Sequence, residues 1–167
     1  VAGIDTQKAF EAYSEEKLVM QTRVNLEGAV SLAHGVLMRR SEQTVCELLA
    51  VGSMSASAPM PYFALYSATK KALEQFWIAL RSEWKGHAKV TVVLPGGIPT
   101  REDIKQNIAA HGWFGRVSAL PPQTVAERAL RAVAKNRRSV VIGFWNKLLH
   151  ALTHLVPLSW RLAVIAK

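Results

Sequence analysis

The chain has little cysteine, a shortage of acidic residues and no long apolar run, and each shortage excludes a class of protein. The single cysteine, Cys46, cannot form a disulfide within the chain, which fits a reducing compartment and predicts a cytoplasmic protein. No apolar run reaches the roughly 20 residues that a membrane-spanning helix needs. Hydrophobic residues make up 50% of the 167, so the chain is globular rather than disordered.

Basic residues outnumber acidic ones, 21 to 12, and no acid follows Glu127. A net charge of +9 suits nucleic acid or an anionic membrane as partner. The sequence has no zinc finger, no RNP-like aromatic strand and no regular arginine spacing, so we expect no nucleic-acid partner. His150 and His154 are four residues apart but have no evident third ligand, and the other histidines show no metal-ligand spacing. We therefore expect no metal.

Hydrophobic periodicity predicts the order of the secondary structure. Helical spacing covers 15–39, 63–85, 122–136, 144–154 and 158–166, with a shorter helix at 101–111. Strands are predicted at 44–51, 89–94 and 139–142. We expect Gly86 to cap the helix at 63–85, and the glycine-flanked segment 112–115 to be flexible.

Tyr66 and Lys70 are the strongest candidates for chemistry. They lie four residues apart, which places them on one face of the predicted helix. A lysine ammonium near a phenol favours the phenolate, so we expect Lys70 to lower the pKa of Tyr66 from about 10. Tyr66 would then be a usable general acid or base near neutral pH. The alternative is a pair on the surface of the helix.

Three further elements accompany this pair in a fixed order. Asn25 lies in the first amphipathic segment, Ser53 follows the apolar run 48–52, and the strand 89–94 runs into Pro95-Gly96-Gly97-Ile98-Pro99-Thr100. Together with Tyr66 and Lys70 this set resembles the short-chain dehydrogenase/reductase family, from about Val1 to about Gly143. The resemblance implies an α/β fold with a doubly wound, Rossmann-like parallel sheet.

The resemblance also implies an activity and a role for each residue. It implies an NAD(P)-dependent oxidoreductase that interconverts a ketone and a secondary alcohol through a Ser-Tyr-Lys site. Tyr66 would exchange a proton with the substrate, Lys70 would hydrogen-bond the nicotinamide ribose, and Ser53 would stabilise charge on the substrate oxygen. Asn25 would anchor a water that links Lys70 to solvent. The alternative for Ser53 is that it only caps the end of the strand, and Ser55 is a second candidate for the catalytic role of Ser53. The alternative for Asn25 is that its side chain only hydrogen-bonds backbone groups.

The segment that follows the second predicted strand, 89–94, would meet the cofactor. By resemblance, Pro95, Gly96, Ile98 and Thr100 lie against the nicotinamide of NADP or NAD, and the alternative is an ordinary strand-to-loop turn. Residues 101–120 would form a substrate lid, with Trp113 and Phe114 as its apolar residues, or a loop packed on the surface.

The first half of the family's pattern is not in this sequence. The glycine-rich T-G-x-x-x-G-x-G turn is absent, and Val1-Ala2-Gly3-Ile4 looks like the end of the family's N-N-A-G segment. We therefore expect residues 1–143 to be the C-terminal part of a catalytic domain, inactive alone. An exposed parallel strand edge would favour poor solubility or a homo-oligomer. The alternative is a non-enzymatic, truncated homologue that acts as an interaction or membrane-associated module.

Residues 144–167 form an apolar and basic extension. Three interpretations stay open besides ordinary core packing: a peripheral membrane contact with tryptophans and cations at headgroup depth, a wall of an apolar substrate pocket, or a subunit contact. A lipid-like carbonyl or alcohol substrate would suit the first two. The helix with Trp77 and Trp84 resembles the family's dimer-forming helix, although its apolar stripe suits a core equally.

Overall fold

The computed structural model describes residues 3–110 and 112–165. Several sequence predictions fall outside this description: the Val1 and Ala2 positions of the opening motif, His111, and the end of the last predicted helix at Ala166. The side chain of Phe114 also lies outside it.

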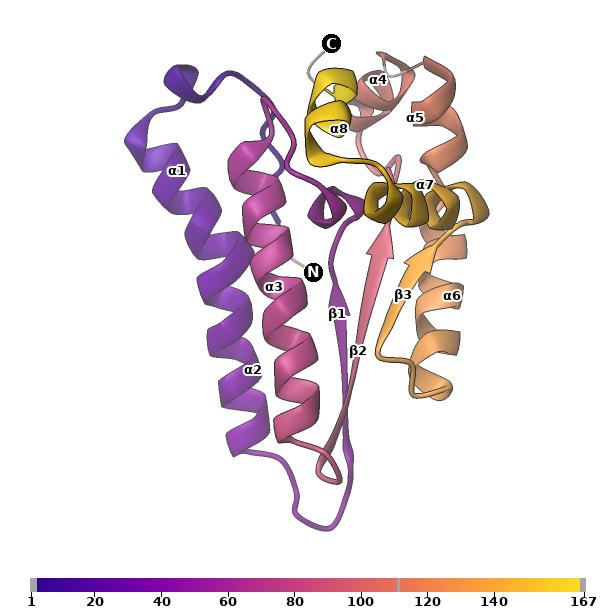
Figure 1. The fold of residues 1–167 in the computed structure, drawn as a ribbon. Helices are drawn as coiled ribbons and strands as arrows, with labels where there is room; N and C mark the ends of the chain where they lie inside the picture. Colours follow the sequence, from indigo (N-terminus) through magenta and orange to yellow (C-terminus); the bar gives the residue numbers. More distant parts are fainter. Residues whose placement is uncertain (1–2, 111, 166–167) are drawn as a thin grey trace.

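Three parallel strands form the sheet that positions the site. They are β1 (Cys46–Val51), β2 (Ala88–Pro95) and β3 (Ser139–Ile142), in the order β1-β2-β3. Val51 pairs with Val93, and Pro95 pairs with Ile142, so the carboxyl ends of the strands meet at one edge (Figure 1). The central strand β2 is buried along nearly its whole length, as a parallel strand covered on both faces must be. The predicted α/β class with a parallel sheet is confirmed.

Helices cover both faces of this sheet (Figure 1). One face carries α3 (Ala64–Glu83) and the long helix made of α1 (Glu15–Thr22) and α2 (Gly28–Met38), while α6 (Pro122–Ala134) covers the other. Because side chains alternate along a strand, β2 serves two cores. Val90, Val92 and Leu94 pack with α2 and α3, whereas Val93 packs with α6.

The apolar stripe of α3 belongs to the first of these cores. Leu73, Trp77 and Leu80 are buried there. The helix ends at Glu83 with Trp84 as its cap, so the prediction that Gly86 caps it is wrong. Gly86 instead has a φ of +92°, in the left-handed region that glycine adopts without strain, and it turns the chain toward β2.

The predicted helix at 15–39 is interrupted by a wider turn. Residues Arg23–Glu27 form a five-residue π-helical segment between α1 and α2. Such segments insert one extra residue into a helix and often occur at functional sites. This one places Asn25 in the interior, where its side chain is 1% exposed.

Short helices gather over the carboxyl ends of the strands (Figure 1). They are η3 (Met54–Ser57), α4 (Glu102–Ala110), α5 (Gly112–Ser118), α7 (Phe144–Leu155) and α8 (Leu158–Ile165). The segment 112–115, predicted to be flexible, is therefore helical. Gly112 turns the chain with a φ of +58°, and the Trp113 ring lies 5.4 Å from the Trp145 ring of α7. No helix within 3–110 or 112–165 is long and apolar enough to cross a bilayer.

Candidate active site

A pocket of about 630 Å³ lies at the carboxyl ends of β1 and β2. Seven of the eight residues predicted for the site line it: Ser53, Tyr66, Lys70, Pro95, Gly96, Ile98 and Thr100. The eighth, Asn25, lies outside the lining. Ligands of open α/β sheets bind at this edge, because loops from several strands converge there. The structure thus brings together residues from β1, α3 and β2 that lie far apart in the sequence.

Ser53 reaches the pocket because β1 ends two residues earlier. Its hydroxyl oxygen accepts hydrogen bonds from the backbone N–H of Ser55 at 3.1 Å and from the Ser55 hydroxyl at 2.9 Å. Ser55 also lines the pocket. The two serines are therefore not simple rivals: Ser55 orients the oxygen of Ser53.

Tyr66 and Lys70 share one face of α3, as their spacing predicts. The Tyr66 ring stacks on Phe63 at a centroid distance of 4.3 Å, which fixes its direction. The Lys70 Nζ lies 5.5 Å from the centre of the Tyr66 ring, and Lys70 is only 5% exposed. Burial lowers the pKa of Lys70, because a charged ammonium loses its water, and the negative charge of Asp5 partly opposes this.

The expected effect of Lys70 on Tyr66 is not what this arrangement produces. Burial raises the pKa of the Tyr66 phenol above 10.0, a hydrogen bond with Ser53 opposes this, and the charge of Asp5 adds to it. The prediction of a lowered pKa is therefore wrong for this structure, because desolvation outweighs the other influences. At neutral pH Tyr66 is a protonated phenol, which is the form that donates a proton.

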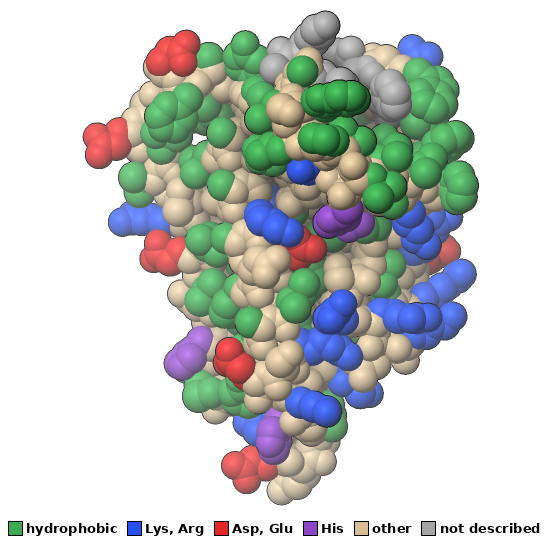
Figure 2. All heavy atoms as spheres, viewed as in Figure 1, with side chains coloured by type: hydrophobic (Ala, Val, Ile, Leu, Met, Phe, Trp, Pro, Cys, Tyr) green, Lys and Arg blue, Asp and Glu red, His purple; other side chains and the backbone are tan. Residues whose placement is uncertain are grey.

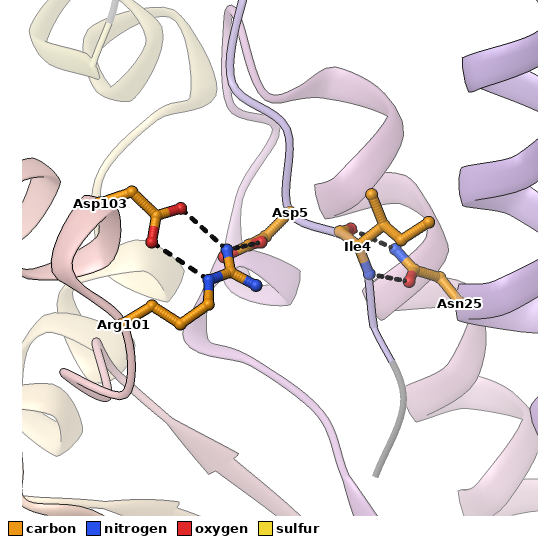
Figure 3. Close-up of polar contacts among 5 residues, drawn as sticks. All are labelled: Ile4, Asp5, Asn25, Arg101 and Asp103. Carbon is orange, nitrogen blue, oxygen red and sulfur yellow. Dashed lines mark hydrogen bonds and ion pairs between the residues drawn. The ribbon is translucent and has the colours of Figure 1, made fainter.

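Asn25 sits behind the pocket and holds the N-terminal segment. Its Oδ1 accepts from the backbone N–H of Ile4 at 2.8 Å, and its Nδ2 donates to the Ile4 carbonyl at 2.9 Å (Figure 3). The same Nδ2 donates to Thr69 Oγ1 at 3.4 Å. These contacts match the alternative interpretation of Asn25, in which its side chain satisfies the hydrogen bonds of backbone groups. An ideal Cβ on Gly3 would lie 3.7 Å from Asn25 Oδ1 and 3.8 Å from Lys70 Nζ, so this segment passes close to both.

An ion-pair cluster on the other side of the same segment was missed from the sequence. Arg101 Nη2 lies 3.1 Å from Asp5 Oδ1 and 3.0 Å from Asp103 Oδ2, and its Nε donates to Asp103 Oδ1 at 3.1 Å (Figure 3). The two carboxylates raise the pKa of Arg101 further. Asp5 and Arg101 both line the pocket, so the cluster joins the N-terminal segment to the start of α4. No spacing in the sequence relates Asp5 to Arg101.

Asn146 of α7 is a second residue that the sequence did not single out. It is 1% exposed, and its Nδ2 donates to the Ser118 carbonyl at 2.9 Å and to the Ile142 carbonyl at 2.7 Å. An ideal Cβ on Gly96 would lie 2.7 Å from this Nδ2 and would also meet the Ser118 carbonyl. Gly96 is therefore required for close packing between the pocket floor, α5 and α7. The available signal was a single amide, next to two aromatic residues, near the start of an amphipathic helix.

His150 is held by a residue of η3 rather than by a metal site. Its Nδ1 lies 2.8 Å from Ser57 Oγ, and its ring contacts that of His154 at 4.9 Å. Burial, and secondarily His154, lower its pKa. Among the described residues no three His, Cys, Asp or Glu side chains are placed to bind a metal ion.

Part of the segment predicted to be a substrate lid lines the pocket. Ile104 of α4 and Ser118 at the end of α5 line the pocket, together with Leu149 and Thr153 of α7. The Trp113 side chain is not in the lining and is 56% exposed. The inner face of α7 thus matches one interpretation of the C-terminal extension, namely that it forms a wall of an apolar pocket.

The fold and the pocket define a Rossmann-type protein of the short-chain dehydrogenase class, and comparison with known proteins assigns the family. The family described as "short chain dehydrogenase" matches residues 1–110, so the chain belongs to the short-chain dehydrogenase family. A dehydrogenase/reductase SDR family protein 7-like from Anopheles gambiae is 27% identical over 141 residues, which cover 80% of this chain and 44% of the relative. An 11-beta-hydroxysteroid dehydrogenase-like 4A from Arabidopsis thaliana is 27% identical over 158 residues, covering 93% and 52%.

Solved structures show the same fold. A 7beta-hydroxysteroid dehydrogenase superposes with a TM-score of 0.85 at 20% identity, covering 100% of this chain and 65% of its own. The angucycline C-6 ketoreductase LanV with bound NADP has a TM-score of 0.69 at 16% identity, covering 87% and 60%. A 4-hydroxyisoleucine dehydrogenase complexed with NADH has a TM-score of 0.70 at 20% identity, covering 86% and 64%. The chain spans about half the length of the curated relatives it matches.

Proposed function

We propose that this chain carries the proton-transfer site of an NAD(P)-dependent oxidoreductase that interconverts a ketone and a secondary alcohol. The observation that supports this most directly is the meeting of Ser53, Tyr66 and Lys70, from two separate elements, in one pocket beside residues 95–100. A half-buried, protonated phenol next to a hydroxyl and an ammonium is suited to exchanging a proton with a carbonyl or alcohol oxygen.

The residues present fit the nicotinamide end of such a cofactor. Lys70 and Tyr66 offer donors to ribose hydroxyls, while Gly96, Ile98 and Thr100 present backbone along one wall of the pocket. Two structural neighbours hold NADP and NADH, which supports either cofactor here. The glycine-rich turn that grips pyrophosphate is not among these 167 residues. We therefore propose the activity for a protein that includes such a turn, and expect the 167 residues alone to be inactive.

The bound cofactor would supply the hydride chemistry, and the side chains of this chain would handle the proton. Ser53, with its oxygen oriented by Ser55, is placed to hydrogen-bond the substrate oxygen and stabilise the charge that develops there. Tyr66 donates the proton during reduction. In the reverse direction Tyr66 must first lose its proton, so its raised pKa predicts that alcohol oxidation becomes faster as pH rises through the alkaline range.

The pocket walls favour a lipophilic substrate. Met54, Met60, Phe63, Ile104 and Leu149 contribute apolar surface to its lining. Apolar wall surface beside the polar groups of Ser53, Tyr66 and Lys70 suits a carbonyl group on an apolar skeleton. The relatives named as hydroxysteroid dehydrogenases are consistent with a substrate of this class.

Substitution of Tyr66 tests this proposal. In the protein that includes the cofactor-binding turn, Tyr66→Phe removes only the proton-transferring hydroxyl, and turnover of a lipophilic ketone should fall by about 10²–10⁴-fold. Cofactor binding, followed by fluorescence of the reduced nicotinamide, should persist. Tyr62→Phe is the matched control, because Tyr62 is 57% exposed and lies just before α3. Turnover by Tyr66→Phe equal to that of Tyr62→Phe would contradict the assignment.

A non-enzymatic interaction role is a second candidate, and one observation favours it. A groove of about 720 Å³ lies between α2, α3 and an edge of β1 that pairs with no strand among residues 3–110 and 112–165. An open parallel edge is a site for strand addition or self-association. Light scattering of the 167-residue chain tests it: a monomer at high concentration would count against this edge as an association site and against the expected homo-oligomer.

A further inference from the structure

We propose that the outer surface of the C-terminal helices docks on an anionic lipid bilayer. This surface, the apolar cap, consists of exposed apolar side chains of α5, α7 and α8: Trp113, Phe144, Trp145, Leu148, Leu155 and Trp160. The membrane contact stands on the structure alone. Its consequence for substrate entry rests on the proposed function.

The apolar cap is strongly exposed, and its aromatic side chains at 113, 144 and 145 adjoin. Phe144 is 74% exposed, Leu155 78% and Trp160 70%. The Trp145 ring lies 5.4 Å from Trp113 and 5.6 Å from Phe144, so the aromatic side chains adjoin. Figure 2 shows hydrophobic side chains gathered over the region where Figure 1 places α5, α7 and α8. Large contiguous apolar patches of this kind mark interaction sites.

Packing within the chain does not account for the outer face of α7. The inner face supplies Asn146, Leu149 and Thr153 to the pocket, and the opposite face exposes Phe144, Leu148 and Leu155. Exposed apolar side chains that share one face of a helix indicate a neighbour on that side. The fold leaves this face of α7 uncovered, so its neighbour lies outside the fold.

Charge indicates which partner covers the cap. No acidic residue follows Glu127, whereas α6, α7 and α8 carry cations, among them Arg128, Arg131, Lys147 and Arg161. Figure 2 shows Lys and Arg side chains along the flank of the molecule below the cap. Tryptophan and phenylalanine beside cations are typical of helices that lie in the interface of anionic membranes. In a symmetric contact a second copy would place the same cations opposite each other, which disfavours self-association through this face.

Docking by the cap would set the active-site pocket against the bilayer. Helix α7 lies between them, because its inner face lines the pocket and its outer face belongs to the cap. A lipophilic ketone dissolved in the membrane would then reach the pocket by a short path at the rim of α7, without crossing water.

Vesicle flotation of the 167-residue chain tests the membrane contact without any enzyme assay. Flotation separates bound protein from self-associated protein, which would sediment. The vesicles are phosphatidylcholine alone, or with about one third phosphatidylserine to supply negative surface charge. We expect the anionic vesicles to bind the chain more strongly, with the difference reduced at about 0.5 M salt.

Two matched substitutions locate the contact. The double variant Phe144→Ser, Trp160→Ser removes exposed aromatic area from the cap, and binding should fall at least about tenfold. Phe10→Ser removes a phenylalanine that is 65% exposed on the N-terminal segment, and binding should be unchanged. Circular dichroism checks that each variant is folded, and blue-shifted tryptophan emission of the unaltered chain on vesicles gives a second readout.

Three results would overturn the proposal. The first is no flotation with either vesicle. The second is an equal loss for Phe10→Ser and for the double variant. The third is a stable dimer that the double variant converts to a monomer with no vesicle binding, which would assign the cap to a second copy. None of these depends on turnover, so the oxidoreductase proposal would stand or fall separately.

Discussion

Two buried amides on one helix should respond to substitution with opposite signs. Asn25 and Gln21 lie one turn apart and are each 1% exposed. The Asn25 amide hydrogen-bonds both backbone groups of Ile4. Within the described chain, neither the oxygen nor the nitrogen of the Gln21 amide has a hydrogen-bond partner. The two side chains are equally buried, but only Asn25 is hydrogen-bonded. Substituting each of them therefore separates the contribution of hydrogen bonds to stability from the contribution of packing.

The magnitudes follow from these contacts. Asn25→Leu keeps the branched shape but removes the two hydrogen bonds to Ile4, of 2.8 and 2.9 Å, and the weaker one to Thr69 at 3.4 Å, and it leaves the half-buried N–H and C=O of Ile4 unpaired. At about 1 kcal/mol for each lost bond, plus a partial desolvation penalty, the free energy of unfolding should fall by about 2–3 kcal/mol. Gln21→Met removes two unpaired buried atoms at little change in shape, so that free energy should rise by about 1–2 kcal/mol.

Urea unfolding of the 167-residue chain, followed by circular dichroism, measures both effects. The midpoints should move in opposite directions while the slopes stay equal, because neither substitution changes the surface exposed on unfolding. A loss below about 0.5 kcal/mol for Asn25→Leu would refute the view that Asn25 anchors the N-terminal segment. A loss of stability in Gln21→Met would show that its amide has a partner, such as an ordered water.

Further predictions concern the buried lysine and the tight glycine. Lys70→Met should raise the free energy of unfolding by about 1 kcal/mol or more at neutral pH, because a buried ammonium is replaced by an apolar group. At pH values below its lowered pKa in the folded state, Lys70 is charged in both the folded and the unfolded chain. As pH rises from that pKa toward 10.5, the unfolded chain binds more protons than the folded chain, so the unaltered protein gains stability. The advantage of Lys70→Met in urea unfolding should therefore shrink over that window, and an advantage that grows would contradict the burial argument. Gly96→Ala places a methyl group against Asn146 and Ser118 and should cost about 1–3 kcal/mol, whereas Gly97→Ala, as control, should cost less in the same assay.

Short-range spacing accounts for what was predictable. The four-residue separation of Tyr66 and Lys70 places them on one helix face in any helical structure. Ser53 and the segment 95–100 follow strands, and the carboxyl ends of parallel strands share one edge of a sheet. Together with the resemblance to the short-chain dehydrogenase/reductase family, these local rules identified seven residues that the structure places around one pocket.

Local rules failed where an element depends on its neighbours. The π-helical segment at Arg23–Glu27 leaves the apolar periodicity almost unchanged, so the sequence reads as a continuous helix. The glycines at 112 and 115 suggested a flexible linker, but ring contact between Trp113 and Trp145 accompanies a helix there. The pKa of Tyr66 depends on burial, which the pair spacing does not reveal.

By itself, the sequence determined the order of helices and strands, the position of Tyr66 and Lys70 on one helix face, and the basic, apolar character of the C-terminus, because each follows from residue order and composition. The parallel α/β architecture was predicted through the family resemblance that these residues carry. Only the tertiary structure decided that Asp5 meets Arg101, that Asn146 closes the packing around Gly96, and that α7 separates the pocket from an exposed apolar cap. These contacts join residues distant in the chain. Their geometry comes from the packing of helices on the sheet, and no local pattern encodes it.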